Sequence, residues 1–167
     1  MEDAKLSRGP MIAITVLRVV VGWHFLYEGL AKLTSPSWTS AGYLRQARGP
    51  FADQFRWLAS QPELLANADT ITMWGLTLVG LLLMLGLFTR LASLAGIGFI
   101  LLFYLATPPF VGYFYAIPSE GSYLVVNKNL VELCALVVIL VTGSGRFAGL
   151  DRILHRLFAR RPRFAPA

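Results

Sequence analysis

Two long apolar runs without a charged residue limit what this chain can fold into. They cover residues 71–88 and 91–107, and only Thr89 and Arg90 separate them. At roughly 1.5 Å per residue in a helix, each run comes close to the roughly 30 Å of hydrocarbon in a bilayer. Because backbone groups in lipid must bond within their own segment, such runs are expected to be helices. The short link predicts a tight antiparallel helical hairpin. Small residues favour close helix contacts, and this role is expected for Gly75, Gly80, Gly86, Gly96 and Gly98.

Two further apolar runs, 11–33 and 124–142, are equally long but contain polar side chains. Over the whole chain, 56% of the residues are hydrophobic and 14% are charged, whereas a soluble domain has roughly 45–50% and about 25%. This composition argues against a water-soluble enzyme and against disorder. We therefore predict an all-α membrane protein, with residues 1–167 forming one integral-membrane domain built as a four-transmembrane-helix bundle. The first run is expected to remain as a spanning helix, because it is too long and too charged for a signal peptide.

The basic residues predict the orientation of the chain. On the side that would hold residues 34–70 and 108–123, the only basic residues are Arg45, Arg48 and Arg56. Lysine and arginine concentrate on the cytoplasmic side of membrane proteins. Both termini and the turn at 89–90 are therefore expected to be cytoplasmic. The basic residues on that side are Lys5, Arg8, Arg90, Arg146, Arg152, Arg156, Arg160, Arg161 and Arg163.

The segments outside the four runs also carry patterns. In residues 34–70, Phe51, Phe55 and Leu58 are spaced i, i+4 and i+7, which favours short helices lying as a cap on the outer surface. The alternative is a plain connector with an interfacial anchor. The cytoplasmic tail, 143–167, is predicted to contain a basic amphipathic helix. Such a helix suits an anionic lipid surface, and nucleic acid is not expected as a partner because the preceding run holds these charges at the membrane.

The cysteine and histidine content excludes several kinds of site. Cys134 is the only cysteine, so the chain alone cannot form a disulfide, a CxxC pair or a four-cysteine metal site. We expect Cys134 to be a small buried apolar residue. His24 and His155 are far apart in the predicted topology, so no metal site is expected.

Ionisable residues inside the first and fourth runs are the main clue to function. Each such group near the bilayer centre costs about 2.5–3.5 kcal/mol. His24, Glu28 and Lys32 are spaced i, i+4 and i+8, so they share one helix face. In the fourth run Lys128 and Glu132 are spaced i and i+4.

The depths of these groups match because the first run leads outward and the fourth leads inward. Glu28 and Lys128 would lie about 6–8 Å below the outer boundary, and His24 and Glu132 about 12–14 Å below it. We therefore expect Glu28 to face Lys128 and His24 to face Glu132. Arg18 lies lower, and would extend to the cytoplasmic headgroups or reach Glu132. One interpretation is an ion-pair network that fixes helix docking. The other is a polar pocket for a proton-coupled ligand.

Five stretches together form a recognisable pattern: LRVVVGWHFLYEGLAKL (17–33), WTSAGYL (38–44), GPFAD (49–53), WGLTLVGLLLMLGLFTRLASLAG (74–96) and EGSYLVVNKNLVE (120–132). They resemble the DoxX/DoxD family of small four-helix membrane proteins. The resemblance extends over roughly residues 11–150 and favours the DoxD-like branch, which includes the small subunit of thiosulfate:quinone oxidoreductase. It implies a multi-pass protein of a bacterial or archaeal cytoplasmic membrane, linked to sulfur-compound oxidation and the quinone pool. The positions shared with the family motifs are Arg18, His24, Glu28, Lys32, Asn127, Lys128, Asn129 and Glu132.

The first functional hypothesis is the membrane subunit of a quinone-linked oxidoreductase. The expected catalytic residues are His24, Glu28 and Glu132, which would exchange protons with a quinone that is not covalently bound. The residues expected to bind the ligand are Arg18, Lys32, Asn127, Lys128, Asn129, Trp23, Tyr27 and Trp38. No flavin, haem or iron–sulfur motif is recognisable, so a partner subunit carrying a redox centre is expected.

The alternative hypothesis is a non-catalytic membrane scaffold, assembly factor or small-ligand binding protein in a redox-related complex. In that case the buried charges would hold the bundle together and the cap would dock a partner. Membrane lipids are expected partners under both hypotheses, and a homo-oligomer is left open.

Overall fold

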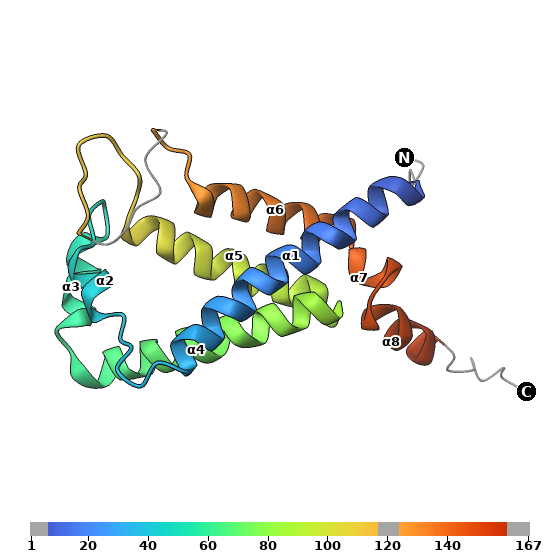
Figure 1. The fold of residues 1–167 in the computed structure, drawn as a ribbon, viewed down its shortest axis with the longest axis horizontal. Coiled ribbons are helices and arrows are strands. Elements are labelled where there is room, and N and C mark those ends of the chain that lie inside the picture. Colours follow the sequence, from blue (N-terminus) through green and yellow to red (C-terminus); the bar gives the residue numbers. More distant parts are fainter. Residues whose placement is uncertain (1–6, 117–123, 160–167) are drawn as a thin grey trace, which may run out of the picture.

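Long helices dominate the part of the chain that the structure describes, which is residues 7–116 and 124–159. In this computed structural model, those residues form helices and loops and contain no strand, which confirms the all-α prediction for this part. Three helices are long and apolar enough to cross a membrane: α1 (Arg8–Leu33), α4 (Pro62–Leu85) and α5 (Thr89–Ala106). Figure 1 shows α1 crossing α4 obliquely, with α5 alongside.

The fourth predicted span differs from expectation. Its helix, α6 (Lys128–Thr142), has 15 residues and extends only about 22 Å, less than the roughly 30 Å of a hydrocarbon core. Residues 124–127 are not helical because Asn127 is extended and caps the helix, its side chain accepting a hydrogen bond from the Leu130 backbone N–H at 3.1 Å. The structure therefore supports three spanning helices by length, with α6 as a shorter companion.

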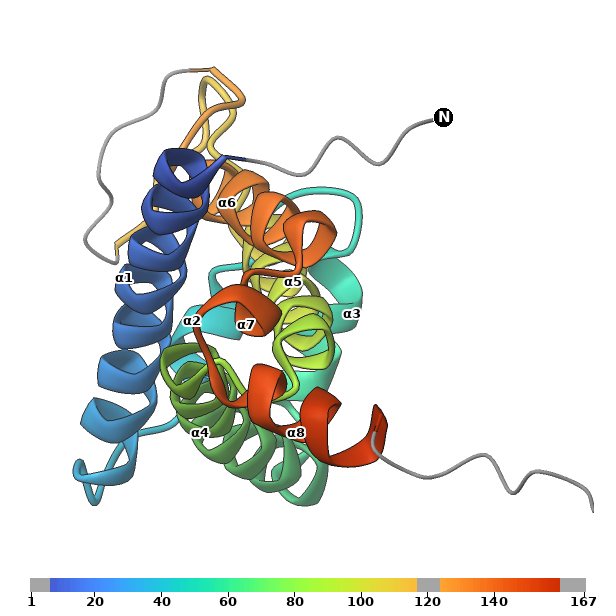
Figure 2. The same ribbon diagram turned by 90° about the vertical axis from the view of Figure 1, so that its right-hand side faces the viewer.

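One hydrophobic core joins α1, α4, α5 and α6, and Figure 2 shows the ribbons of these four helices. Its most enclosed members, Leu83, Leu136 and Ile139, are 0% exposed. Phe25 of α1 packs into the same core. Cys134 of α6 lies outside this core and is exposed, so the expectation of a buried thiol is wrong. The Cys134 side chain therefore lies on the outer side of α6, away from the other helices.

Glycines set the close approach of α1 to α4. A Cβ atom on Gly80 would lie 2.2 Å from the Leu26 backbone nitrogen, and one on Gly29 would lie 2.3 Å from the Thr77 hydroxyl oxygen. No larger residue fits these two positions without moving the helices apart. Gly98 was expected to serve in the same way, but a Cβ atom there meets nothing within 4 Å.

The predicted helical hairpin is present. α4 ends at Gly86, whose φ of 64° is left-handed and suits glycine. α5 then begins at Thr89. The hairpin is longer than predicted, because α4 starts at Pro62 rather than near residue 71. Proline is well suited to the first turn of a helix, because N–H groups there have no acceptor within the helix and the missing N–H of proline costs nothing.

The cap predicted within residues 34–70 contains two short helices, α2 (Ala41–Arg45) and α3 (Ala52–Ala59). They lie beside the first turns of α4, at the left-hand end in Figure 1. The backbone N–H and hydroxyl of Ser40 both donate to the carboxylate of Asp69. This buried aspartate therefore ties the connection after α1 to the start of α4.

The opposite end of the molecule holds the start of α1, the α4–α5 turn, and the helices α7 (Ser144–Phe147) and α8 (Leu150–Ala159) (Figures 1 and 2). On α8, Leu150, Ile153 and Leu157 form an exposed apolar side, while Arg152 and Arg156 project elsewhere. The predicted amphipathic tail helix is therefore present over Leu150–Ala159. Lys5, Arg160, Arg161 and Arg163 lie outside the described residues.

Candidate functional site

A hydrogen bond between α1 and α6 forms the centre of the candidate site. Nδ1 of His24 lies 2.7 Å from Oε1 of Glu132, so the expected pairing of these two residues is present. The Glu132 side chain is 10% exposed and the His24 side chain 43% exposed. The protein therefore shields the carboxyl group, whereas the imidazole reaches the surface of the bundle. An acidic group enclosed in this way requires a hydrogen-bond donor.

Nε2, the second ring nitrogen of His24, has no hydrogen-bond partner among residues 7–116 and 124–159. An imidazole that is bound through one nitrogen and open at the other can pass a proton between two sites. The geometry thus connects an enclosed carboxyl group to the outer surface of the helix pair through a single ring.

Glu28 does not form the predicted ion pair with Lys128. Its carboxylate instead pairs with the ammonium group of Lys32, which also donates to the Glu28 backbone oxygen at 3.2 Å. Residues four apart in a helix are held within reach of each other, so the local partner is favoured over one on another helix. Lys128 lies near enough for its charge to act on both Glu28 and His24.

The aromatic residues expected to cover the ligand form two groups. The Trp23 and Tyr27 rings lie 6.4 Å apart and are 56% and 59% exposed on α1. Trp38 lies beyond the end of α1, with the Lys32 ammonium 5.6 Å from its ring centre. Trp23 and Tyr27 therefore lie on either side of His24 in the sequence, on an exposed surface of α1. Trp38 lies beside Lys32, which belongs to the Glu28–Lys32 ion pair.

Arg18 does not join this cluster, contrary to both expected positions. It is 2% exposed, so it does not extend to the headgroups. Its guanidinium donates to the Ala148 carbonyl oxygen at 2.6 Å and to the Ser144 hydroxyl at 3.4 Å. Because α7 and the residue after it supply both acceptors, Arg18 fastens the C-terminal segment to α1.

The remaining predicted ligand residues lie at the start of α6. The Asn127 side-chain oxygen caps this helix, which leaves its amide nitrogen for other contacts. Lys128 is exposed and Asn129 half-buried in the first turn. The expected ligand-binding role of these three residues stays a prediction.

Sequence reasoning missed the role of Asp151. Its carboxylate accepts hydrogen bonds from the backbone N–H groups of Phe88 at 2.7 Å and Thr89 at 3.0 Å. Its own N–H donates to the Gly86 oxygen at 2.9 Å. Asp151 therefore caps the start of α5 from a distant part of the chain. Nothing in the local sequence of α5 signals this cap, since capping patterns are read within one segment.

The described residues contain no group of three histidine, cysteine or acidic side chains that could hold a metal ion. The polar groups at the His24 site are an imidazole, carboxyl groups, amides and ammonium groups, and they lie beside aromatic rings. This set suits proton exchange and hydrogen bonding to a ligand that carries oxygen atoms.

The fold and the site together define a small helical integral membrane protein with a titratable pair between two of its helices. The sequence model of the DoxX family matches residues 13–109, and the chain belongs to the DoxX family. The matched range contains most of α1, all of α2 to α5, and His24, but not α6 and Glu132. Searches of curated proteins and of solved structures gave no match.

Proposed function

We propose that this chain is the membrane subunit of a quinone-linked oxidoreductase. The observation that supports this most directly is the 2.7 Å contact between His24 and Glu132. Ionisable groups at membrane depth are costly, and they commonly mark paths for protons or ligands. A half-exposed imidazole on an apolar helix can meet a molecule that arrives through the lipid. We assign the oxidation of a sulfur compound to the same complex because the stretches quoted above resemble the DoxD-like branch.

The proposal includes a placement in the cytoplasmic membrane of a bacterium or archaeon. α6 and the residues that precede it serve as the fourth crossing, and both termini are cytoplasmic. This orientation is supported by the described basic residues outside the four apolar runs, because five lie at one end of the bundle (Arg8, Arg90, Arg146, Arg152 and Arg156) and three at the other (Arg45, Arg48 and Arg56). The larger number of basic residues belongs to the end that holds α8.

In this proposal, His24 moves a proton between Glu132 and the lipid-facing side. The carboxyl group of Glu132 holds the proton in the enclosed position, and Nε2 of His24 exchanges it at the surface. Trp23 and Tyr27 provide flat apolar faces, while Lys128 and Asn129 supply hydrogen-bond donors at the outer end. A bound quinone would accept electrons and protons. We assign electron delivery to a partner subunit because the sequence has no recognisable flavin, haem or iron–sulfur motif.

Quinone content after purification tests the proposal. Protein extracted from native membranes is expected to retain quinone, and His24→Gln and Glu132→Gln are each expected to lose most of it. Glu63→Gln removes an exposed carboxylate at the start of α4 and serves as the matched control. Equal quinone in all four preparations, relative to protein, would overturn the proposed function.

A scaffold function is the second candidate, and the cap favours it. Phe51 and Trp57 are 47% and 58% exposed, and aromatic side chains of this kind are common anchors of protein interfaces. Under this alternative, Trp57→Ser would remove a co-purifying partner, while His24→Gln would leave the complex intact. The same pull-down with both variants therefore separates the two functions.

A further inference from the structure

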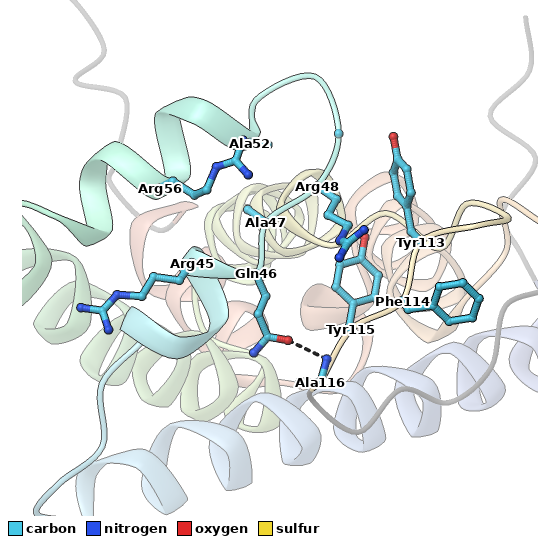
Figure 3. A pocket seen from close by; sticks show the side chains of 11 residues that line it. Arg45, Gln46, Ala47, Arg48, Ala52, Arg56, Tyr113, Phe114, Tyr115 and Ala116 are labelled. Atoms are coloured by element: carbon cyan, nitrogen blue, oxygen red, sulfur yellow. Dashed lines mark hydrogen bonds between the residues drawn. The ribbon is translucent and has the colours of Figure 1, made fainter.

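A hollow lies in the cap, and its lining includes no residue of the His24 site. It has a volume of about 950 Å³ and lies between the α2–α3 region and the segment 113–116 (Figure 3). None of its lining residues belongs to α1, α4 or α6. The proposed function uses none of the residues that line this hollow.

Positive charge dominates the walls of the hollow. Arg45, Arg48 and Arg56 contribute to the lining, and among residues 7–116 and 124–159 no acidic residue does. Arg56 has a carboxylate partner in the exposed Asp53, at 2.7 Å. Within the described residues, neither Arg45 nor Arg48 has an acidic group within ion-pair distance. Uncompensated guanidinium groups attract oxyanions, which they bind through paired hydrogen bonds.

The walls are held in place by contacts with the end of α5. The Arg48 backbone N–H donates to the Ala106 oxygen at 3.0 Å. On the opposite wall, the Tyr115 hydroxyl donates to the Pro108 oxygen at 2.8 Å. The two walls meet where the Ala116 N–H donates to the Gln46 side-chain oxygen at 2.7 Å, as Figure 3 shows. These contacts hold the backbone of both walls, so ligand binding would require little further ordering of it.

Aromatic side chains form the other part of the lining. Tyr113, Phe114 and Tyr115 follow one another on one wall, and the Arg48 side chain extends toward Tyr115 in Figure 3. Phe114 is 81% exposed, which leaves a flat apolar surface uncovered. Pockets for small organic ligands commonly have volumes of about 300–1,000 Å³. An inorganic oxyanion alone would fill only a small part of this space.

We propose that the cap hollow binds a water-soluble organic anion, in which a carboxylate, sulfonate or phosphate group is attached to a flat apolar ring. The acidic group contacts Arg48 and shares the guanidinium group of Arg56 with Asp53, and the ring lies against Tyr113 and Phe114. A lipid headgroup offers the same acidic chemistry, and the experiment distinguishes the two sources.

The probe is 2-naphthoate, measured by equilibrium dialysis against the full chain in nanodiscs of zwitterionic lipid, with empty nanodiscs subtracted. We expect saturable binding of one naphthoate per chain that weakens as salt is added. Arg48→Gln should weaken binding by about tenfold or more, whereas Arg48→Lys should retain part of it. Arg90→Gln, an exposed arginine at the opposite end, should leave it unchanged. The same measurement on Arg56→Gln covers the case in which Arg48→Gln does not fold.

Three results would overturn the proposal. Equal binding by wild type, Arg48→Gln and Arg56→Gln would show that the arginines do not hold the probe. Equally tight binding of the neutral 2-naphthol would show that the hollow binds the ring through apolar contacts alone, without recognising an acidic group. Loss of naphthoate binding when phosphatidylglycerol is included in the nanodisc would assign the hollow to a lipid headgroup. None of these measurements depends on quinone retention, so this proposal and the proposed function fail separately.

Discussion

At the scale of single residues, the pair His24 and Glu132 combines two environments. The carboxyl group lies within the helix bundle at 10% exposure, and its partner ring is 43% exposed. A buried ion pair can be neutral for stability as a whole, but the loss of one member leaves the other unsatisfied. The pair therefore has structural consequences whether or not it moves protons, and these can be measured separately from activity.

A double-mutant cycle measures the coupling between the two side chains. His24→Gln and Glu132→Gln should each lower the free energy of unfolding in detergent, because each leaves a polar partner unmatched. The double variant should be destabilised less than the sum, with a coupling of about 1–3 kcal/mol. Additive effects would mean that the 2.7 Å contact contributes nothing to the fold.

Tyr43 makes the stability of the cap dependent on pH. Its hydroxyl donates to the Phe103 oxygen at 2.7 Å, and burial raises its pKa from 10.0 to about 12. The folded protein thus keeps this proton at a pH where the unfolded chain loses it. Its contribution to stability is complete below pH 10.0 and is lost as the pH rises through about 12.

Thermal unfolding at increasing alkaline pH checks this expectation. The unfolding temperature of the wild type should fall more steeply across that range than that of Tyr43→Phe, which has no phenol to ionise. Tyr27→Phe, on the exposed face of α1, is the matched control and should follow the wild type. Parallel curves for wild type and Tyr43→Phe would contradict the assigned cause.

At the scale of helices, the sequence predicted the positions of the helices better than the side-chain contacts between them. Apolar run length located α1 and α5, because lipid requires continuous helical bonding. Run length did not predict the start of α4 at Pro62, because the first turns of this helix contain polar residues and lie outside the apolar run. The equal depths expected for His24 and Glu132 in the membrane correctly predicted that these two side chains meet. The same argument failed for Glu28, because Lys32 competes from the same helix.

Arg18 shows a different limit of sequence reasoning. Its partners are a backbone carbonyl and a serine hydroxyl, and neither carries a charge that would mark it as a partner for arginine. Such contacts depend on how the chain folds back on itself after α6. The same holds for the cap hollow, whose two walls are separated by more than fifty residues in the sequence and meet only in three dimensions.

The contact between α1 and α4 can be tested at Gly80. Gly80→Ala places a Cβ atom 2.2 Å from the Leu26 backbone nitrogen, so the helices must separate. We expect a loss of about 1–3 kcal/mol in unfolding free energy. Gly98→Ala adds the same atom where nothing lies within 4 Å and should leave stability unchanged or raised. Equal effects of the two variants would contradict close packing as the reason for Gly80.

The cap on α5 predicts a local loss of protection. Asp151→Ala removes the acceptor of the Phe88 and Thr89 N–H groups, which should cost about 0.5–2 kcal/mol. Hydrogen exchange at these two amides should accelerate, and Asp151→Asn should restore part of the protection. Asp53→Ala, which removes an exposed carboxylate in α3, is the control. Unchanged exchange in Asp151→Ala would show that water replaces the carboxylate without cost.

At the scale of the whole molecule, the proposed orientation can be read by cysteine labelling. Cys134→Ala leaves a chain without cysteine, into which Arg56→Cys, Ala116→Cys or Arg146→Cys is introduced singly. A membrane-impermeant maleimide applied to intact cells should label positions 56 and 116, and should label position 146 only after permeabilisation. Because positions 116 and 146 flank α6, labelling of both from the same side would exclude α6 as a crossing.

The origin of the α5 cap has a consequence for biosynthesis. The carboxylate at the start of α5 comes from a residue 62 positions later than Thr89. While the ribosome is still making α6, the nascent chain already contains both arms of the α4–α5 hairpin, and local backbone hydrogen bonds such as Leu87 N–H to the Leu82 oxygen can close its turn. The N–H groups of Phe88 and Thr89 cannot be capped until Asp151 has emerged from the ribosome, so truncated products that end before Asp151 would begin α5 with these two groups uncapped.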